Sequence, residues 1–194
     1  MLGLIEDLGW VRTMGFKNPW DAVILLGKTH PEMGGSEYYH EIHGLTGEIP
    51  PRADGVREKA ALQTVMEAVR AGYVTAVHDC SKGGLAVALA LMSIKGRFGV
   101  EVNLANVPRV NVARMDELLF SETHARFLLT STWEDAKKIL GIASKRNVIA
   151  RLIGKVVGGD DFRFMNNGKL IVECSVDRME KVWEEAIPKV MEVE

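Results

Sequence analysis

The feature that most constrains this chain is a turn, His78-Asp79-Cys80-Ser81-Lys82-Gly83-Gly84-Leu85, which joins two apolar runs of different kinds. Residues 74–77 before the turn predict a short buried strand, and the apolar residues from 85 to 92 after it predict a helix. Glycines at the start of a helix let backbone N–H groups approach a ligand, and the helix N-terminus carries a partial positive charge. The turn therefore suits the binding of a phosphate or a carboxylate group.

The same residues also fit an ordinary tight turn without a ligand. In that interpretation Ser81 caps the helix, Gly83 and Gly84 permit close packing, and His78 and Asp79 bond only to the local backbone. Short glycine-rich motifs match many unrelated turns, so the turn taken alone leaves both interpretations open.

Strand and helix signals alternate along the rest of the chain. They predict strands at residues 22–26, 98–102, 125–130 and 149–157, and a hairpin over residues 162–174 that turns at Asn166-Asn167-Gly168. They predict helices from an N-cap at Ser36 to residue 42, and over residues 53–72, 111–119, 133–144 and 176–193. We therefore expect a mixed α/β chain of the α+β class, with layered helices on a mixed sheet. A single domain is expected over residues 1–194, in which residues 1–15 form a lead-in strand or linker.

Two helices carry more specific expectations. Pro188 is expected to bend or end the last helix near Ile187, because proline lacks the N–H that continues the helical hydrogen bonds. Gly72 is expected to cap the C-terminus of the helix over residues 53–72. The apolar side chains of that helix are expected to fall mainly on one buried face, and they are Val56, Ala60, Leu62, Val65, Met66 and Val69.

Composition and charge exclude several classes of function. The formal net charge of -2 implies no basic surface for nucleic acid, and no apolar run is long enough to cross a membrane. The first ten residues contain Glu6 and Asp7 and no basic start, so they are not a signal peptide. Cys80 and Cys174 lie far apart and fit no metal-binding spacing, so we expect reduced thiols in a cytoplasmic protein, with a disulfide as the alternative.

Two more polar loops adjoin predicted strands. The Gly-Gly-Ser-Glu sequence at residues 34–37 is either a surface loop with a serine cap or a second set of backbone N–H groups for the same ligand. Ser121, Glu122 and Arg126 either end a helix and pair on the surface, or line a site as acceptor and anion partner. Three polar loops that each adjoin a buried strand together favour one shared site.

Taken in order, the motifs resemble a known family. They are similar to the C-terminal part of the large (synthetase II) subunit of phosphoribosylformylglycinamidine synthases, in its aminoimidazole-ribonucleotide-synthetase-type C-terminal domain. The resemblance covers nearly the whole chain and assigns residues 16–194 to that type of domain, which related ATP-dependent synthetases share. The residues that carry it are Gly34-Gly35-Ser36-Glu37-Tyr38, Pro50-Pro51, the turn from His78 to Leu85 with the following Ala86-Val87-Ala88-Leu89, Leu119-Phe120-Ser121-Glu122 and Arg126-Phe127.

Three positions depart from the family pattern. The family usually has a small apolar residue at Cys80, often an aspartate at Lys82, and often a serine where Thr123-His124 follow Glu122. The positive charge of Lys82 argues against a metal-binding carboxylate at the mouth of the turn, and it leaves the backbone N–H groups unaffected. The resemblance does not define the roles of Cys80 and Lys82.

The resemblance implies an ATP-dependent C–N ligase of purine biosynthesis. Such an enzyme converts formylglycinamide ribonucleotide, ATP and ammonia from glutamine into formylglycinamidine ribonucleotide, ADP and phosphate, with Mg²⁺ bridging the phosphates. Its expected partners are N-terminal synthetase domains of the same enzyme, a glutaminase subunit and a small accessory subunit, and a homodimer is allowed. Because the N-terminal domains of this family carry most nucleotide-binding groups, the isolated chain is expected to be inactive and to hold no cofactor tightly.

The resemblance and the loop pattern together give the expected binding residues. The glycines are expected to offer N–H groups to phosphate, the carboxylates to accept hydrogen bonds or order water around Mg²⁺, and Arg126 to offset phosphate charge. No catalytic residue and no metal ligand is assigned. The alternatives are a non-catalytic assembly module of the same enzyme and a domain of a related ATP-dependent synthetase. The expected residues are Gly34, Gly35, Ser36, Glu37, His78, Asp79, Ser81, Gly83, Gly84, Ser121, Glu122 and Arg126.

Overall fold

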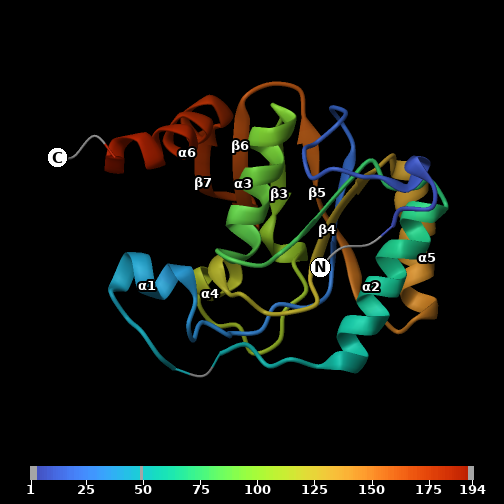
Figure 1. Ribbon diagram of the computed structural model, residues 1–194, viewed down its shortest axis with the longest axis horizontal. Coiled ribbons are helices and arrows are strands. Elements are labelled where there is room, and N and C mark those ends of the chain that lie inside the picture. The colour runs from blue at the N-terminus through green and yellow to red at the C-terminus, as the bar shows by residue number, and fades with distance from the viewer. Residues whose placement is uncertain (1–3, 49, 192–194) are drawn as a thin grey trace.

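The computed structural model describes residues 4–48 and 50–191, which form a seven-stranded sheet with helices on both faces (Figure 1). Its strands are β1 (Ala22–Leu26), β2 (Ala76–Asp79), β3 (Gly99–Asn103), β4 (Phe127–Ser131), β5 (Ala150–Val157), β6 (Asp161–Asn166) and β7 (Lys169–Ser175). They are arranged in the order β2-β4-β1-β5-β3-β6-β7. Neighbouring strands are antiparallel except β3 and β6, which are parallel. The mixed sheet confirms the expected fold class.

The helices form a layer on each face of this sheet. They are α1 (Glu37–His43), α2 (Gly55–Arg70), α3 (Gly84–Gly96), α4 (Met115–Phe120), α5 (Trp133–Lys145) and α6 (Val176–Met191), with short 3-10 helices η1 (Leu8–Trp10) and η2 (Leu104–Asn106). The buried side chains of α2 and α5 pack on one face, and those of α3 and α4 pack on the other, where α6 joins them through Met179. Figure 1 shows these two groups on opposite sides of the strands, with α1 beside α4. Among the described residues, no helix is both long and apolar enough to span a membrane.

Strand β1 is buried on both faces because it lies near the centre of the sheet. Val23 and Leu25 pack in the core beneath α3 and α4, whereas Ala22, Ile24 and Leu26 pack in the core beneath α2 and α5. All five side chains have no solvent exposure. A strand covered on both faces has a continuous run of apolar residues in its sequence, which is why residues 22–26 were predictable as a buried strand.

The expected buried face of α2 was wrong for three large residues. Val56, Leu62 and Met66 are 82%, 51% and 43% exposed. The face that contacts the core consists of Ala61, Thr64, Val65 and Ala68. Small side chains let the helix approach the sheet closely, so size rather than hydrophobicity decided which face is buried.

Other boundaries also differ from expectation. The strand before the turn is β2, which runs into the motif because His78 and Asp79 pair with β4. Helix α4 starts at Met115 instead of residue 111, since Asn111 has a left-handed φ of 58°. Helix α6 continues through Pro188 to Met191, so the proline does not end it near Ile187 as expected. The expected lead-in strand falls partly on residues 1–3, outside the described residues, and residues 4–8 form no strand.

Candidate functional site

The turn at residues 78–85 and the loop at residues 121–126 meet at one pocket of about 650 Å³. Its lining comes from the end of β2 with residues 80–82, from Glu122 and residues 124–126 with the start of β4, and from Pro51 with the first half of α2. Since β2 and β4 are antiparallel, the end of one and the start of the other lie at the same edge of the sheet. The loop at residues 34–37 does not line the pocket, but it adjoins the other two loops through Glu37.

A single carboxylate oxygen of Glu122 joins all three loops. Its Oε1 accepts a hydrogen bond from the backbone N–H of Glu37 at 2.9 Å and another from the backbone N–H of Gly83 at 2.9 Å. Glu37 is the first residue of α1, and Gly83 is the N-cap of α3. Negative charge is stabilised near helix N-termini, so this carboxylate occupies a favourable position. Glu122 is thus an acceptor for the protein's own backbone.

Lys82 and Glu37 form a second connection between two of the loops. The Lys82 ammonium donates to the Glu37 carboxylate at the rim of the pocket. The hydrogen bond and charge of Lys82 lower the pKa of Glu37, and the same interaction raises the pKa of Lys82. Both side chains are exposed, so water screens the pair and its contribution to stability is small.

The backbone N–H groups expected to bind phosphate are largely occupied by the protein itself. Gly83 donates to Glu122, Gly84 donates to the carbonyl of Ser81 at 2.9 Å, and Gly35 donates to the carbonyl of Gly47 at 3.0 Å. The expectation that these three glycines offer free N–H groups is therefore not met in this structure. The reason is that each N–H closes a turn or a loop contact within the chain.

Gly84 has a packing role that the sequence had left open. Its φ is +65°, and a Cβ placed there would lie 2.4 Å from the carbonyl oxygen of Ser121 and 2.8 Å from the carbonyl carbon of Phe120. Glycine permits both the left-handed backbone and the close approach of α3 to the end of α4. The close-packing interpretation of the turn thus holds at Gly84, whereas Ser81 does not cap α3, because Gly83 takes that position.

The two serines among the expected residues hold loops in place. Ser36 is buried, and its Oγ accepts a hydrogen bond from the N–H of Tyr39 at 3.3 Å, which caps α1 as predicted. Ser121 is fully buried, and its Oγ donates to the carbonyl of His30 at 2.6 Å. Both hydroxyls therefore serve the architecture of the site's walls.

Arg126 is a buried cation in the wall of the pocket. Its side chain is 1% exposed, and its guanidinium donates to the carbonyls of Thr123 and Ser121 and to Oγ1 of Thr29. No carboxylate lies within 4.0 Å of it among residues 4–48 and 50–191. Burial lowers the pKa of Arg126 below its ordinary value, and arginine side chains in proteins stay protonated. Arg126, which helps to line the pocket, therefore carries a buried positive charge with no contacting carboxylate in the described part of the chain.

The remaining expected residues divide between two pockets. Asp79 and Ser81 are exposed and line the pocket beside Arg126. His78 lines a neighbouring pocket of about 680 Å³ together with Arg12 and Lys95. His78 and Asp79 approach each other at 3.5 Å between Nδ1 and Oδ1. Gly34, in the loop over residues 34–37, is buried.

Three polar residues near the site were not singled out from the sequence. His30 Nε2 lies 3.4 Å from Nη1 of Arg57, and burial is the main cause that lowers the pKa of His30. Glu32 Oε2 and Arg57 Nε are buried and have no hydrogen-bond partner among the described residues. The polar residues 28–32, which follow a buried strand, could have pointed to His30 and Glu32. Arg57 lies on α2, where no such signal is present.

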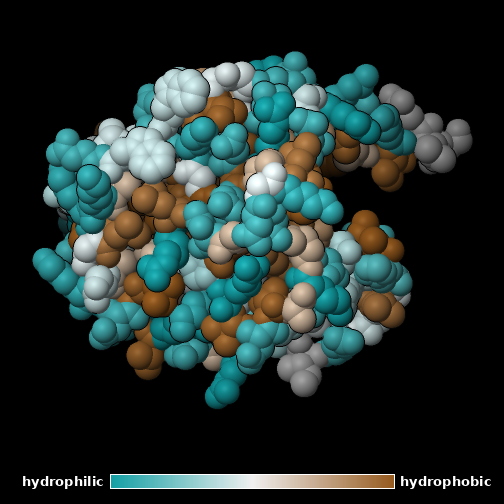
Figure 2. Space-filling model, turned by 180° about the vertical axis from the view of Figure 1, so that it is seen from behind, coloured by the Kyte–Doolittle hydropathy of each residue, from teal (hydrophilic) through white to brown (hydrophobic). Residues whose placement is uncertain are grey.

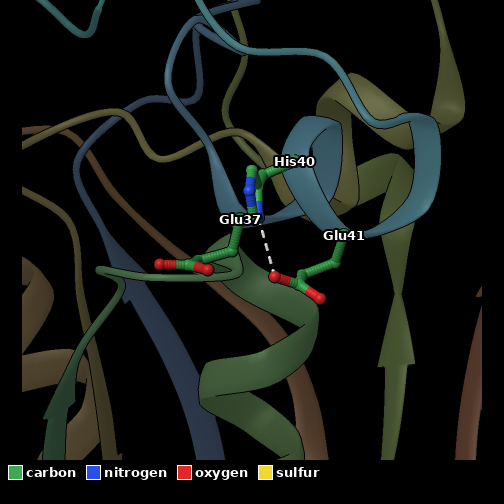
Figure 3. A group of neighbouring side chains, drawn as sticks. All are labelled: Glu37, His40 and Glu41. Carbon is green, nitrogen blue, oxygen red and sulfur yellow. Dashed lines mark hydrogen bonds and ion pairs between the residues drawn. The ribbon is translucent and has the colours of Figure 1, made fainter.

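Three side chains of the types that bind metal ions lie on α1, next to the pocket rim. The ligand atoms of Glu37, His40 and Glu41 lie within 4.8 Å of one another. Figure 3 shows His40 bound to Glu41, with Nδ1 and Oε1 2.7 Å apart, and the Glu37 carboxylate beside that pair. Lys82 already pairs with Glu37, and Glu122 is committed to two N–H groups. These carboxylates therefore do not fit a Mg²⁺ site made by this chain alone.

Comparison with known proteins defines the class of domain. Residues 19–166 match the family described as AIR synthase related protein, C-terminal domain, and the chain belongs to that family. The relatives include phosphoribosylformylglycinamidine synthase subunit PurL of Moorella thermoacetica, which is 42% identical over 191 residues, covering 98% of this chain and 25% of that protein. PurL of Methanocaldococcus jannaschii is 42% identical over 171 residues, covering 88% of this chain and 22% of that protein.

Solved structures give the same result for the fold. Thermotoga maritima PurL complexed with FGAR has a TM-score of 0.79 at 23% identity, covering 89% of this chain and 30% of that chain. The same protein complexed with ATP has a TM-score of 0.75 at 22% identity, covering 89% of this chain and 28% of that chain. This chain spans about a quarter of the length of the curated relatives above. The matches confirm the resemblance to the large subunit of phosphoribosylformylglycinamidine synthases.

Proposed function

We propose that this chain forms one domain of a phosphoribosylformylglycinamidine synthase and contributes a wall of its substrate site. The complete enzyme would convert formylglycinamide ribonucleotide, ATP and glutamine-derived ammonia into formylglycinamidine ribonucleotide, ADP and phosphate. The structural observation that carries the proposal is the pocket where the motif loops meet, which the buried Arg126 helps to line. Identity of 42% over nearly the whole chain with PurL supports the reaction.

The charges around the pocket fit a phosphate-bearing ligand. Arg126 lies in the wall without a contacting carboxylate, and Lys59 and Lys82 line the rim. Coulomb interactions are stronger at a site partly shielded from water, so a buried cation attracts an anion more than a surface lysine does. Glu58 and Asp79 also line the pocket and would accept hydrogen bonds from ribose hydroxyls or amide N–H groups.

The nucleotide and its metal require residues beyond this chain. ATP would supply the phosphoryl group that activates the amide oxygen for displacement by ammonia. Glu37 is engaged by Lys82 and Glu122 by two backbone N–H groups, so Mg²⁺ and the triphosphate would be held mainly by the N-terminal synthetase domains. A glutaminase subunit and a small accessory subunit would complete a cytoplasmic assembly. One solved neighbour is described as the structure of PurLQS from Thermotoga maritima, which supports partner subunits.

A second candidate function is a non-catalytic module that positions other domains. The observation in its favour is that the N–H groups of Gly35, Gly83 and Gly84 are satisfied by the chain itself. On this view the loops are rigid contact surfaces, and the pocket is covered in the assembly.

The experiment that separates the two is a steady-state assay of the complete protein that carries this chain. ATP- and ammonia-dependent amidination of formylglycinamide ribonucleotide is expected, with none from the 194-residue chain alone. Lys59→Ala is expected to raise KM for the ribonucleotide roughly fivefold, because a phosphate contact is lost, and Lys137→Ala on α5 serves as the control. Unchanged KM in Lys59→Ala would favour the assembly module. Absence of amidination by the complete protein would overturn the proposed reaction.

A further inference from the structure

Glu122 connects loops that are distant in the sequence through one atom. The two N–H groups on its Oε1 belong to residues 85 and 39 positions away. Hydrogen bonds to an ionised group are stronger than neutral ones, and a shared acceptor fixes both donors relative to each other. The relative position of the starts of α1 and α3 therefore depends on this carboxylate.

The surroundings of Glu122 give the connection a consequence for the pocket. Gly83 directly follows Lys82, and both Lys82 and Glu122 line the pocket. Gly83 and Gly84 have left-handed φ values of 74° and 65°, and because glycine is conformationally permissive, this turn depends on outside contacts to hold that geometry. The other connection, between Lys82 and Glu37, involves exposed side chains that water screens. The less exposed of the two connections between these loops is therefore the one that Glu122 makes.

We propose that Glu122 is a positioning residue that fixes the loop carrying Ser81 and Lys82 relative to α1 at the mouth of the substrate pocket. The inference rests on the proposed function, and it specifies how Glu122 serves that function. Glu122 acts by accepting two hydrogen bonds and does not act as a proton acceptor or as a ligand of metal or substrate. Its Oε1 is fully used by the backbone, which leaves the charge facing the protein's own N–H groups.

Three substitutions in the complete protein test this role. Glu122→Gln keeps an oxygen at the same distance, so it is expected to retain KM for formylglycinamide ribonucleotide within about threefold. Glu122→Asp keeps the charge but is one methylene shorter, so it is expected to be worse than Glu122→Gln. Glu122→Ala removes the acceptor and is expected to raise KM about tenfold or more, with a smaller change in kcat.

A readout that does not need activity is hydrogen exchange of the complete protein, followed by mass spectrometry. Segments that contain the amides of Glu37 and Gly83 are expected to be protected in the wild type and in Glu122→Gln, and to exchange faster in Glu122→Ala. If the wild type shows no amidination, the proposed function fails, and exchange still decides the positioning role. If Glu122→Ala does not fold, the comparison of Gln with Asp decides it.

Glu117→Ala provides a matched control. Glu117 Oε2 also accepts two backbone N–H groups, from Ala113 and Arg114 at 3.0 Å each, but both directly precede α4, the helix that carries Glu117. This variant is expected to lower Tm without changing KM. The positioning role is overturned if Glu122→Gln is as defective as Glu122→Ala, if Asp is better than Gln, or if Glu122→Ala changes Tm alone.

Discussion

Arg126 Nη1 donates to Thr29 Oγ1 at 3.0 Å although the two residues are 97 positions apart. Thr29 lies in the loop after β1, and Arg126 directly precedes β4, so the bond joins two loops at the same edge of the sheet. Gly27 makes room for it, since a Cβ there would lie 2.4 Å from the carbonyl oxygen of Ala125. The guanidinium is thereby part of the framework that holds these two loops together.

Arg126→Lys is expected to lower the free energy of unfolding by roughly 2–3 kcal/mol, since one ammonium cannot reach three acceptors that lie in different directions. Urea unfolding of the purified chain measures the change. Arg146→Lys is the control, because Arg146 pairs with Glu67 at the surface and should change stability by less than about 0.5 kcal/mol. Equal effects of the two substitutions would contradict the framework role.

Gly84→Ala is expected to cost about 2 kcal/mol or more, because the new Cβ would overlap the backbone at the end of α4 and would strain a left-handed residue. Gly72→Ala is the matched control. Gly72 has a φ of +76° with open space around it, so it reports the backbone cost alone, about 1 kcal/mol. Thermal melts of both variants give the comparison, and a Gly84→Ala protein as stable as the wild type would refute the close packing.

Acid should weaken the fold through His30. Burial lowers the pKa of His30 below its ordinary value of 6.5, so the unfolded chain binds more protons than the folded chain as the pH falls below about 6.5. This contribution to stability is present above pH 6.5 and is lost at lower pH. Denaturant midpoints from pH 8 to pH 5 are expected to fall less steeply in His30→Gln. Parallel curves for the variant and the wild type would argue against it.

The two cysteines should differ sharply in reactivity. Burial raises the pKa of the Cys80 thiol to about 11, whereas Cys174 is partly exposed. Thiolate is the reactive form, so iodoacetamide at pH 8 is expected to label Cys174 first and Cys80 only after unfolding. Peptide mass spectrometry over time measures both rates. Labelling of Cys80 at the rate of Cys174 would contradict this order. Both cysteines are free thiols, which answers the question of a disulfide between them.

The isolated chain is expected to self-associate through α6. Val182, Trp183 and Ile187 are each more than half exposed on this helix, and Figure 2 shows hydrophobic side chains where it projects beside the grey terminal residues. Exposed apolar surface of this kind favours association. Light scattering should show larger species as concentration rises, and Ile187→Glu should reduce them. A monomer at every concentration would contradict the expectation.

Local signals were sufficient for most elements of this fold. The Asn167-Gly168 pair predicted the turn between β6 and β7, and both residues have the positive φ values of a primed hairpin turn. The contacts inside the site could not be predicted in the same way. The partner of the Gly83 N–H is Glu122, and nothing near Gly83 in the sequence indicates that its N–H is already occupied. Likewise, the sequence left Arg126 either paired at the surface or lining a site, and three loop acceptors that surround it after folding explain its burial.

The strand order has a consequence for how the molecule assembles and opens. Within the described sheet, β6 and β7 are the one pair of neighbours that are also consecutive in the chain. Their hairpin closes a short loop, whereas β1, β2 and β4 must find partners across long stretches of sequence, which is entropically slower. We therefore expect the hairpin to form early, and the edge built by β2 and β4 to form late. In native-state exchange, the amides of β2 should open at lower free energy than those of β1, so the pocket would lie at the most labile edge of an otherwise rigid sheet.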